Sequence, residues 1–147
     1  MRVIIQRVIE SSVTINNKIY NKIDNGLMVL VGFTDEDTSN DIDYIVRKIV
    51  NLRIFVDEFG IMNKSILDTG GSILSISQFT LYADTKKGNR PSYIKALKGE
   101  YAINLYNEFN NKLSKFIETK TGIFGADMKV NLINDGPITI MIDSKNK

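Results

Sequence analysis

Apolar residues that alternate with polar ones, or that run together, predict several strands in the first part of the chain. Short apolar runs at residues 3–5 and 8–9 are followed by strict alternation over residues 12–16, and the Asn16-Asn17 pair then predicts a tight turn. Residues 26–33 (GLMVLVGF) form one continuous apolar run. Such a run is typical of a strand that is buried on both faces.

A spacing of three to four residues between apolar positions predicts two helices. The first follows the polar segment 34–40, in which Thr38, Ser39 or Asn40 can cap it, and its apolar positions are Ile42, Ile45, Val46 and Ile49. The second signal is longer and carries apolar residues from Ile94 to Ile117. Pro91 stands at a natural first position for this helix, and Gly99 marks either a kink or a break in it.

The remaining segments complete the pattern of an α+β fold. Residues 72–84 (SILSISQFTLYAD) read as a strand whose alternation slips at Gln78, which fits a bulge. Apolar runs at residues 130–133 and 138–142 flank an Asp-Gly pair, which is a hairpin signal. Short polar turns favour antiparallel pairing. We therefore expect one domain over residues 1–147, with a curved, mostly antiparallel, barrel-like sheet and two helices packed on it.

The composition restricts the chemistry more than the fold. The chain of 147 residues is 43% hydrophobic, which suits one compact domain. It has no cysteine, which excludes thiol nucleophiles, and no histidine, which excludes a Ser-His-Asp triad and histidine-containing zinc sites. We expect no metal and no cofactor. Neither a signal peptide nor a run of ~18 apolar residues is present, so we expect a cytoplasmic protein without a membrane partner.

Charge is nearly balanced over the whole chain but not along it. The net charge of +2 means that any contact with nucleic acid needs a local patch. One candidate lies between Asp84 and Glu100, where no acidic residue interrupts a series of cations: Lys86, Lys87, Arg90, Lys95 and Lys98. A solvated loop and helix face explains these residues equally well.

Hydroxyl and amide side chains gather at Ser77, Gln78 and Thr80, with Phe79 between them. Ser77 or Thr80 as a nucleophile would need an activating base, and the chain offers no histidine and no lysine with a sign of burial. We therefore expect a positioning role. In that role, backbone N–H groups at the strand end stabilise a carbonyl oxygen that becomes negative during ester hydrolysis. Ordinary strand residues remain the alternative.

Pro137, one of only two prolines, stands where the last strand begins and removes a ladder donor there. A cis bond before it would turn the backbone sharply, but only about 5–6% of X-Pro bonds are cis, so the sequence leaves the isomer open. Arg7 lies in the first strand, where a surface charge is the default interpretation.

Two segments, SQFTLYADTKKGNRPSY at residues 77–93 and NDGPIT at residues 134–139, make the chain resemble the D-aminoacyl-tRNA deacylases. The resemblance covers essentially the whole chain, including RVIIQRV, GLMVLVG and NLRIFVDEFGIMN. It implies an enzyme that hydrolyses the ester between a D-amino acid, or glycine, and the terminal adenosine of tRNA. It also implies a homodimer with active sites at the subunit interface, the aminoacyl-tRNA acceptor end as partner, and no DNA partner.

The resemblance also implies roles for individual residues. Gly136 and Pro137 would form a Gly-cisPro element that enters the partner's site and excludes an L side chain, and Arg7 would brace it. Ser77, Gln78, Phe79 and Thr80 would line the pocket, with water as the attacking group and a ribose hydroxyl helping to activate it. The adenosine pocket would be formed by Phe124, Gly125, Ala126 and Met128.

Two other classes of function stay open at this point. One is an RNA-binding module without catalysis that uses Lys86, Lys87 and Arg90, and the other is an interaction protein whose paired strands form a dimer surface. Turnover separates the first from an enzyme, and the oligomeric state in solution tests the second.

Overall fold

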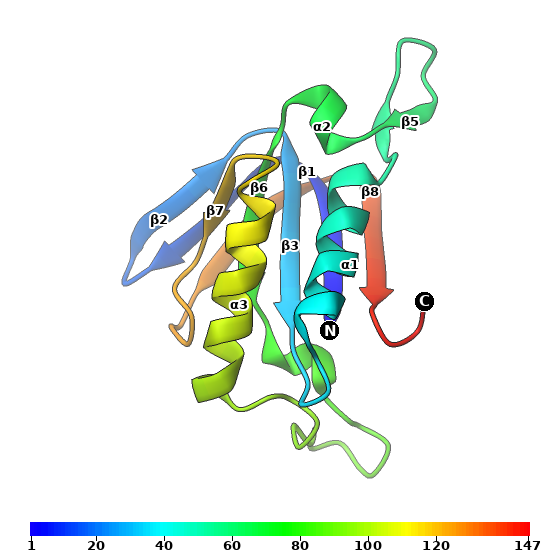
Figure 1. The fold of residues 1–147 in the computed structure, drawn as a ribbon. Helices are drawn as coiled ribbons and strands as arrows, with labels where there is room; N and C mark the ends of the chain where they lie inside the picture. Colours follow the sequence, from blue (N-terminus) through cyan, green and yellow to red (C-terminus); the bar gives the residue numbers. More distant parts are fainter.

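The computed structural model describes all residues from Met1 to Lys147, and it confirms the predicted α+β fold. Helices α1 (Ser39–Asn51) and α3 (Gly99–Leu113) lie on one face of a curled six-stranded sheet (Figure 1). The strands of this sheet are β1 (Arg2–Ile15), β2 (Lys18–Ile23), β3 (Gly26–Gly32), β6 (Ser72–Ser77), β7 (Thr119–Thr121) and β8 (Lys129–Asp143). The short elements are β4 (Phe55–Val56), β5 (Met62–Lys64), α2 (Ile66–Thr69) and the 3₁₀ turn η1 (Phe79–Tyr82). The structure contains no helix that could span a membrane.

Strand β1 organises the sheet. It pairs along its length with β8, and it also pairs with β3 through residues 2–8 and with β2 through residues 11–15, always antiparallel. The next two pairs, β3 with β6 and β6 with β7, are parallel. Parallel neighbours need long crossover connections, and the segments containing α1 and α3 supply them. The antiparallel pairing that short turns favour therefore holds for β1, β2, β3 and β8, while β6 and β7 complete a mixed sheet.

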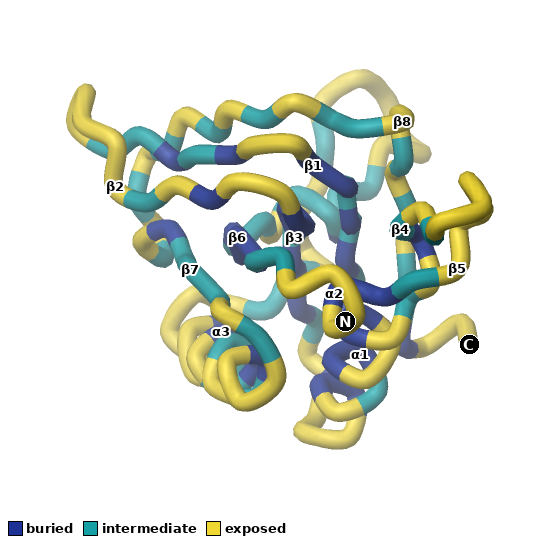
Figure 2. Tube along the Cα trace, turned by 90° about the horizontal axis from the view of Figure 1, so that it is seen from above, coloured by how far each residue is buried: buried dark blue, intermediate teal, exposed yellow.

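The sheet curls until β2 approaches β7 (Figure 2). Asn21 Nδ2 donates to the carbonyl of Thr121 at 2.6 Å, and Lys120 Nζ donates to the carbonyl of Lys22 at 2.9 Å. The curl encloses a small apolar cluster that includes Val13 and Leu74, while a larger cluster lies between the sheet and the helices. Strand β3 contributes to both clusters, which confirms its predicted burial on both faces.

Local signals at the first turn and the first helix are confirmed. Asn16 and Asn17 have φ angles of 50° and 61°, as a tight hairpin turn requires. Thr38 is the N-cap of α1, and its N–H donates to the Asp41 carboxylate at 2.9 Å. The predicted apolar positions of this helix are all buried: Ile42, Ile45, Val46 and Ile49.

The helix predicted to begin at Pro91 begins instead at Gly99, so that prediction is wrong. Asp84 and Ser92 exchange two backbone hydrogen bonds of 2.8 and 2.9 Å, which hold the chain beside Pro91 in an extended pairing. Ile94 is 84% exposed and belongs to no helix face. Gly99 therefore marks the start of α3 rather than a kink inside it.

The strand predicted over residues 72–84 is also shorter than expected. Strand β6 ends at Ser77, and the Gln78 N–H makes a last bond to the carbonyl of Val31 at 2.7 Å. The chain then enters η1. The slip in alternation at Gln78 thus marks the end of a strand and not a bulge, because a 3₁₀ turn also changes which side chains face inward.

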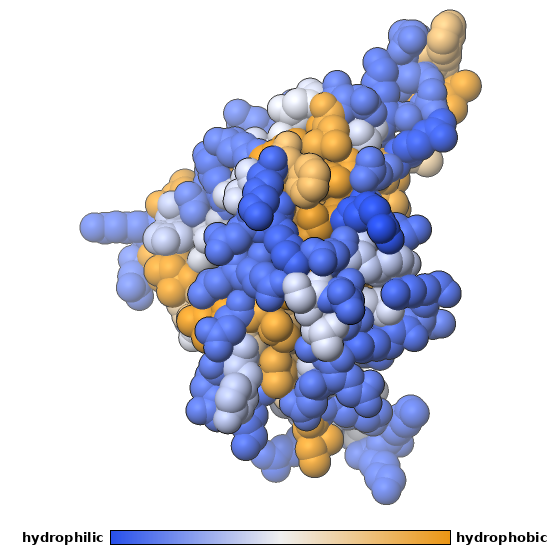
Figure 3. Space-filling view, in the orientation of Figure 1, coloured by the Kyte–Doolittle hydropathy of each residue, from blue (hydrophilic) through white to orange (hydrophobic).

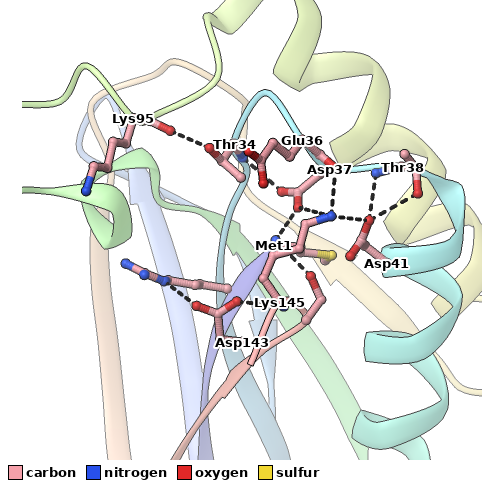
Figure 4. Close-up of polar contacts among 11 residues, drawn as sticks. Met1, Thr34, Glu36, Asp37, Thr38, Asp41, Lys95, Asp143 and Lys145 are labelled. Atoms are coloured by element: carbon pink, nitrogen blue, oxygen red, sulfur yellow. Dashed lines mark hydrogen bonds and ion pairs between the residues drawn. The ribbon is translucent and has the colours of Figure 1, made fainter. Parts of the chain in front are cut away.

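A buried polar network fixes the end of the sheet at which β1 begins. The amino group of Met1 pairs with the Asp37 carboxylate and donates to Ser144 Oγ at 3.0 Å. Lys145 Nζ donates to Asp41 Oδ2 at 3.0 Å, so the segment after β8 is also held against α1 (Figure 4). In the loop between β3 and α1, Thr34 Oγ1 donates to the carbonyl of Lys95 at 2.7 Å. The network thereby reaches the segment that precedes α3.

Candidate functional site

A pocket of about 620 Å³ opens where β3 and β6 end. The ends of these strands meet three connecting segments there, namely η1, the stretch before α3 and the loop between β7 and β8. Predicted site residues from two separate parts of the sequence line it: Ser77, Gln78, Phe79, Phe124, Gly125, Ala126 and Met128. The fold thus brings together the two segments that the family resemblance suggested as pocket residues, although Thr80, which was expected with them, is not among the lining residues.

Gly32, the last residue of β3, allows the chain to turn closely over the pocket floor. A Cβ atom at this position would lie 2.7 Å from the carbonyl oxygen of Gln78 and 3.2 Å from Leu81 Cβ. Only glycine permits this approach without displacing the backbone. Gln78 is therefore held at the pocket edge by the main chain of a core strand.

The N-terminus of η1 presents unused backbone donors beside the pocket. The N–H groups of Phe79 and Thr80 bind no acceptor within the protein, because the first N–H groups of a helical turn have no partner inside it. The Thr80 hydroxyl accepts a hydrogen bond of 2.5 Å from Gln78 Nε2, and no carboxylate or lysine contacts it. This arrangement suits binding of a carbonyl oxygen and gives Thr80 no base.

Aromatic rings form two walls of the pocket. Phe79 and Tyr93 meet edge to face with centroids 5.0 Å apart, and both rings are exposed in part. Phe124 packs against Tyr106 at 5.7 Å. Burial raises the pKa of Tyr106 above its usual range, against the lowering effect of its hydrogen bond to the Ser75 carbonyl. Tyr106 is therefore a neutral phenol that supports Phe124.

The segment NDGPIT lies elsewhere and is not a hairpin. Gln6 is paired with Thr139 and Val8 with Asn134, so residues 135–138 stand opposite Arg7 alone. They form a protrusion within β8, in which Gly136 and Pro137 are exposed and joined by a cis peptide bond. The hairpin prediction was wrong because β1 continues past this point and keeps pairing with β8 on both sides of it.

Arg7 is buried beneath the protrusion. Its Nη1 donates to the carbonyl of Ile54 at 2.5 Å, and its Nε lies 2.9 Å from Asp135 Oδ2. The Nε–H does not point along this second contact, so we describe it as an ion pair rather than a hydrogen bond. The default interpretation of Arg7 as a surface charge is wrong, since the residue is only 7% exposed.

Asn134 was quoted in the sequence motif but given no role, and the structure gives it one. Its Nδ2 donates to the carbonyl of Arg7 at 3.0 Å and to the carbonyl of Ile138 at 2.9 Å. Its Oδ1 accepts from Thr139 Oγ1 at 3.1 Å. One amide side chain thus joins the two ends of the protrusion, and an asparagine inside an apolar strand was the available signal.

The two motifs lie at opposite ends of β3 within one chain. Ser77 is in register with Val31, whereas Arg7, which faces the protrusion, is in register with Leu27. Leu27 and Val31 are four residues apart along β3, which corresponds to about 13 Å at ~3.3 Å per residue. No residue of the protrusion lines the pocket. A single chain therefore does not form one site from both motifs.

Several residues that line the pocket were absent from the predicted set, among them Tyr93 and Lys98. Tyr93 and Lys98 reach it from the stretch before α3. Tyr93 closes the motif that begins at Ser77, which was the signal for it, whereas the mistaken helix at Pro91 obscured Lys98. No group of three or more acidic side chains is arranged to hold a metal ion.

Comparison with known proteins agrees with this architecture. The sequence model described as D-Tyr-tRNA(Tyr) deacylase matches residues 4–143. A D-aminoacyl-tRNA deacylase of Bacteroides fragilis is 62% identical over 149 residues, which cover 100% of this chain and 99% of that relative.

Two solved structures share the fold. The structure of a protein named c-Myc DNA Unwinding Element Binding Protein is 41% identical, with a TM-score of 0.93 over 97% of this chain and 98% of that chain. A probable eukaryotic D-amino acid tRNA deacylase has a TM-score of 0.81 at 19% identity, over 96% of this chain and 97% of that chain, which shows the fold alone.

The whole-length matches, together with the pocket and its free backbone donors, define the chain as a hydrolase. More narrowly, the chain belongs to the D-aminoacyl-tRNA deacylase family.

Proposed function

We propose that the chain hydrolyses the ester bond of D-aminoacyl-tRNA and releases the free D-amino acid and tRNA. Glycyl-tRNA that is mischarged on other tRNAs is a second substrate, and the reaction serves translation quality control in the cytoplasm. One observation carries the proposal: Ser77, Gln78 and Phe79 of the family's signature segment line an aromatic-walled pocket, and the backbone N–H groups of Phe79 and Thr80 beside it have no acceptor in the protein.

The chemistry follows from these donors. The ester carbonyl oxygen accepts hydrogen bonds from the N–H groups of Phe79 and Thr80, which stabilise the negative charge of the tetrahedral intermediate. Water adds to the carbonyl carbon, a ribose hydroxyl helps to activate it, and the ribose ester oxygen leaves with a proton. Phe124 offers a face on which the terminal adenine stacks, beside Gly125, Ala126 and Met128.

Chirality is selected by a second copy of the chain. Gly136 and Pro137 of that copy enter the pocket, and their two main-chain carbonyls hold the free amino group of the substrate. An L side chain then collides with backbone, whereas a D side chain of any size points outward. The exposure of both residues, the Arg7 and Asn134 contacts that hold them, and their distance from their own pocket support this homodimeric, cross-subunit site.

Deacylation of one tRNA charged in parallel with D-tyrosine and L-tyrosine tests the proposal. We expect loss of the D-ester alone, without added metal. Loss of both esters would indicate a general esterase and contradict the role of Gly136 and Pro137. Loss of neither by a folded dimer would favour an RNA-binding module, and a monomer at micromolar concentration would contradict the cross-subunit site.

A further inference from the structure

We infer that the loop of residues 85–91 binds the phosphate backbone of the RNA helix whose charged end enters the pocket. The inference rests on the proposed function, because it concerns the part of the substrate that lies outside the pocket. It assigns Lys86, Lys87 and Arg90 to phosphates of the acceptor stem, as contacts that position the substrate and take no part in the chemistry.

The loop is closed at its base and projects from the body of the protein. Asp84 and Ser92 exchange two backbone hydrogen bonds, of 2.8 and 2.9 Å, that pair the two ends of the loop. The segment between them extends from the lower right of the molecule in Figure 1, and hydrophilic side chains cover this region in Figure 3. Lys86, Lys87 and Arg90 are all exposed.

These three cations have no ion-pair partner in the protein. None of them forms an ion pair, whereas elsewhere lysines pair with nearby carboxylates: Lys22, Lys64, Lys95, Lys112, Lys129 and Lys145. The one acidic residue at the loop, Asp84, already has partners within the protein. Asp84 accepts the Lys86 N–H at 2.9 Å and lies 3.5 Å from Lys95 Nζ, so it does not neutralise the three cations.

The loop is fixed relative to the pocket by the residues that follow it. Tyr93 comes directly after the paired base and forms a pocket wall with Phe79. The Lys95 carbonyl accepts from Thr34 Oγ1 at 2.7 Å, and the Leu97 N–H donates to the Phe33 carbonyl at 2.9 Å. Lys98 lines the pocket itself. Positive charge therefore continues from the pocket rim to the loop. An RNA strand that leads away from a terminal nucleoside in the pocket would place its phosphates along this path.

The experiment compares two substrates and two triple variants. The test variant is Lys86→Gln/Lys87→Gln/Arg90→Gln, and the control is Lys18→Gln/Arg47→Gln/Lys115→Gln, which removes the same charge from exposed, unpaired positions elsewhere. The substrates are D-tyrosyl-tRNA and D-tyrosyl-adenosine, which lacks the stem. The readout is kcat/KM between about 50 and 200 mM salt, the range in which phosphate contacts weaken strongly.

We expect the test variant to lose about 10- to 100-fold in kcat/KM on D-tyrosyl-tRNA at low salt, through KM. The magnitude of the negative slope of log kcat/KM against log salt should decrease by roughly two to three, since each of the three phosphate contacts contributes about 0.7 to 0.9. Hydrolysis of D-tyrosyl-adenosine should not change, and the control variant should match the wild type. Equal behaviour of the two triple variants on tRNA would overturn the inference, as would an equal loss by the test variant on the adenosine ester.

A binding arm separates this inference from the proposed function. If the wild type hydrolyses neither substrate, the proposed function fails, and fluorescence anisotropy with an uncharged RNA hairpin ending in CCA still tests the loop. We expect salt-sensitive binding that weakens at least tenfold in the test variant alone. Unchanged binding in that variant, or tighter binding of the matching DNA hairpin by the wild type, would overturn the assignment to RNA.

Discussion

The pocket and the protrusion at residues 135–138 lie at opposite ends of β3 and are built in opposite ways. The pocket is concave, its walls are aromatic, and the unused main-chain N–H groups of Phe79 and Thr80 lie beside it. The protrusion is convex and exposed, and polar side chains beneath it, Arg7 and Asn134, hold it in place. Under the proposed function, the pocket with its unused donors accepts the fixed protrusion of a second copy of the chain.

The largest effect should come from replacing Gly136 and Pro137 together by alanine. Gly136 has a φ of 119°, and a Cβ atom there would lie 2.8 Å from Ile138 Cγ1 and 3.3 Å from Arg7 Nη2. The protrusion must therefore move, and a displacement of ~1 Å at a site can cost about 100-fold in rate. We expect at least that loss in kcat/KM for D-tyrosyl-tRNA, with discrimination against the L-ester largely gone.

Gly60→Ala is the matched control for this double variant. Gly60 also has a positive φ, of 78°, but it lies at the tip of the β4–β5 hairpin with no atom within 4 Å of a built Cβ. The Gly60→Ala variant should be slightly less stable than the wild type and should keep both its activity and its selectivity for the D-ester. If the control lost as much kcat/KM and selectivity as the double variant, the effect would come from backbone strain in general and not from the protrusion.

Asn134→Ala should show that the protrusion works because it is held in place. The substitution removes the bonds to the Arg7 and Ile138 carbonyls and leaves those groups without this partner. We expect a loss of about 1–3 kcal/mol in the free energy of unfolding, measured by urea titration, and roughly a tenfold fall in kcat/KM. Asn131→Ala, at an exposed position of the same strand, should change neither quantity.

Phe124→Leu tests the pocket rather than the protrusion. Loss of a stacking face costs about 1–3 kcal/mol in binding a base, so KM should rise about tenfold while kcat stays within about twofold. Steady-state kinetics on D-tyrosyl-tRNA measure both constants. Phe116→Leu, a change of the same kind at a residue that is 57% exposed beyond the end of α3, should behave as the wild type.

Thr80→Val should have a smaller effect on the rate. The Thr80 hydroxyl only accepts a hydrogen bond from Gln78, and the donor that matters in our account is the Thr80 backbone N–H, which valine retains. We expect less than a tenfold decrease in kcat. A nucleophilic role would instead cost at least about 1,000-fold, and single-turnover kinetics with the D-ester distinguish the two.

Asp41→Asn should lower the stability of the fold without changing the pocket or the protrusion. Burial raises the pKa of Asp41, but hydrogen bonds from Ser144, Thr38 and Lys145 outweigh it, so the pKa lies below its usual value of 3.8. The carboxylate therefore stabilises the fold fully above about pH 4, and this contribution is lost as the pH falls through the folded-state pKa. Urea titrations should show the variant weaker by about 1–3 kcal/mol at pH 7, with the difference shrinking in acid.

Sequence reasoning identified most elements because their periodicity is local. The apolar spacing of Ile42, Ile45, Val46 and Ile49 defined α1, and the run at residues 26–33 defined β3. It failed where a long-range pairing decides the local conformation. Pro91 did not begin a helix because Ser92 pairs with Asp84, and the Asp-Gly signal did not make a hairpin because β1 continues beside it.

The candidate site was predictable in its parts but not in its geometry. Motif residues at Ser77–Phe79 and Phe124–Met128 do share one pocket, since the ends of β3 and β6 and the β7–β8 loop meet there. Sequence alone did not show that Arg7 is buried or that Asn134 joins the ends of the protrusion, because both roles depend on the register between β1 and β8. The separation of the two motifs along β3 also depends on strand register, so the sequence alone did not show it either.

Complementation between two inactive variants tests whether each active site is shared between two chains. Ala126→Trp should fill the pocket, and Gly136→Ala/Pro137→Ala should disable the protrusion, so each homodimer should be inactive on D-tyrosyl-tRNA. After co-refolding in equal amounts, half of the dimers are mixed and each contains one intact site. We expect recovery of about one quarter of wild-type activity. No recovery, in a preparation shown by native mass spectrometry to contain mixed dimers, would contradict a site shared between two chains.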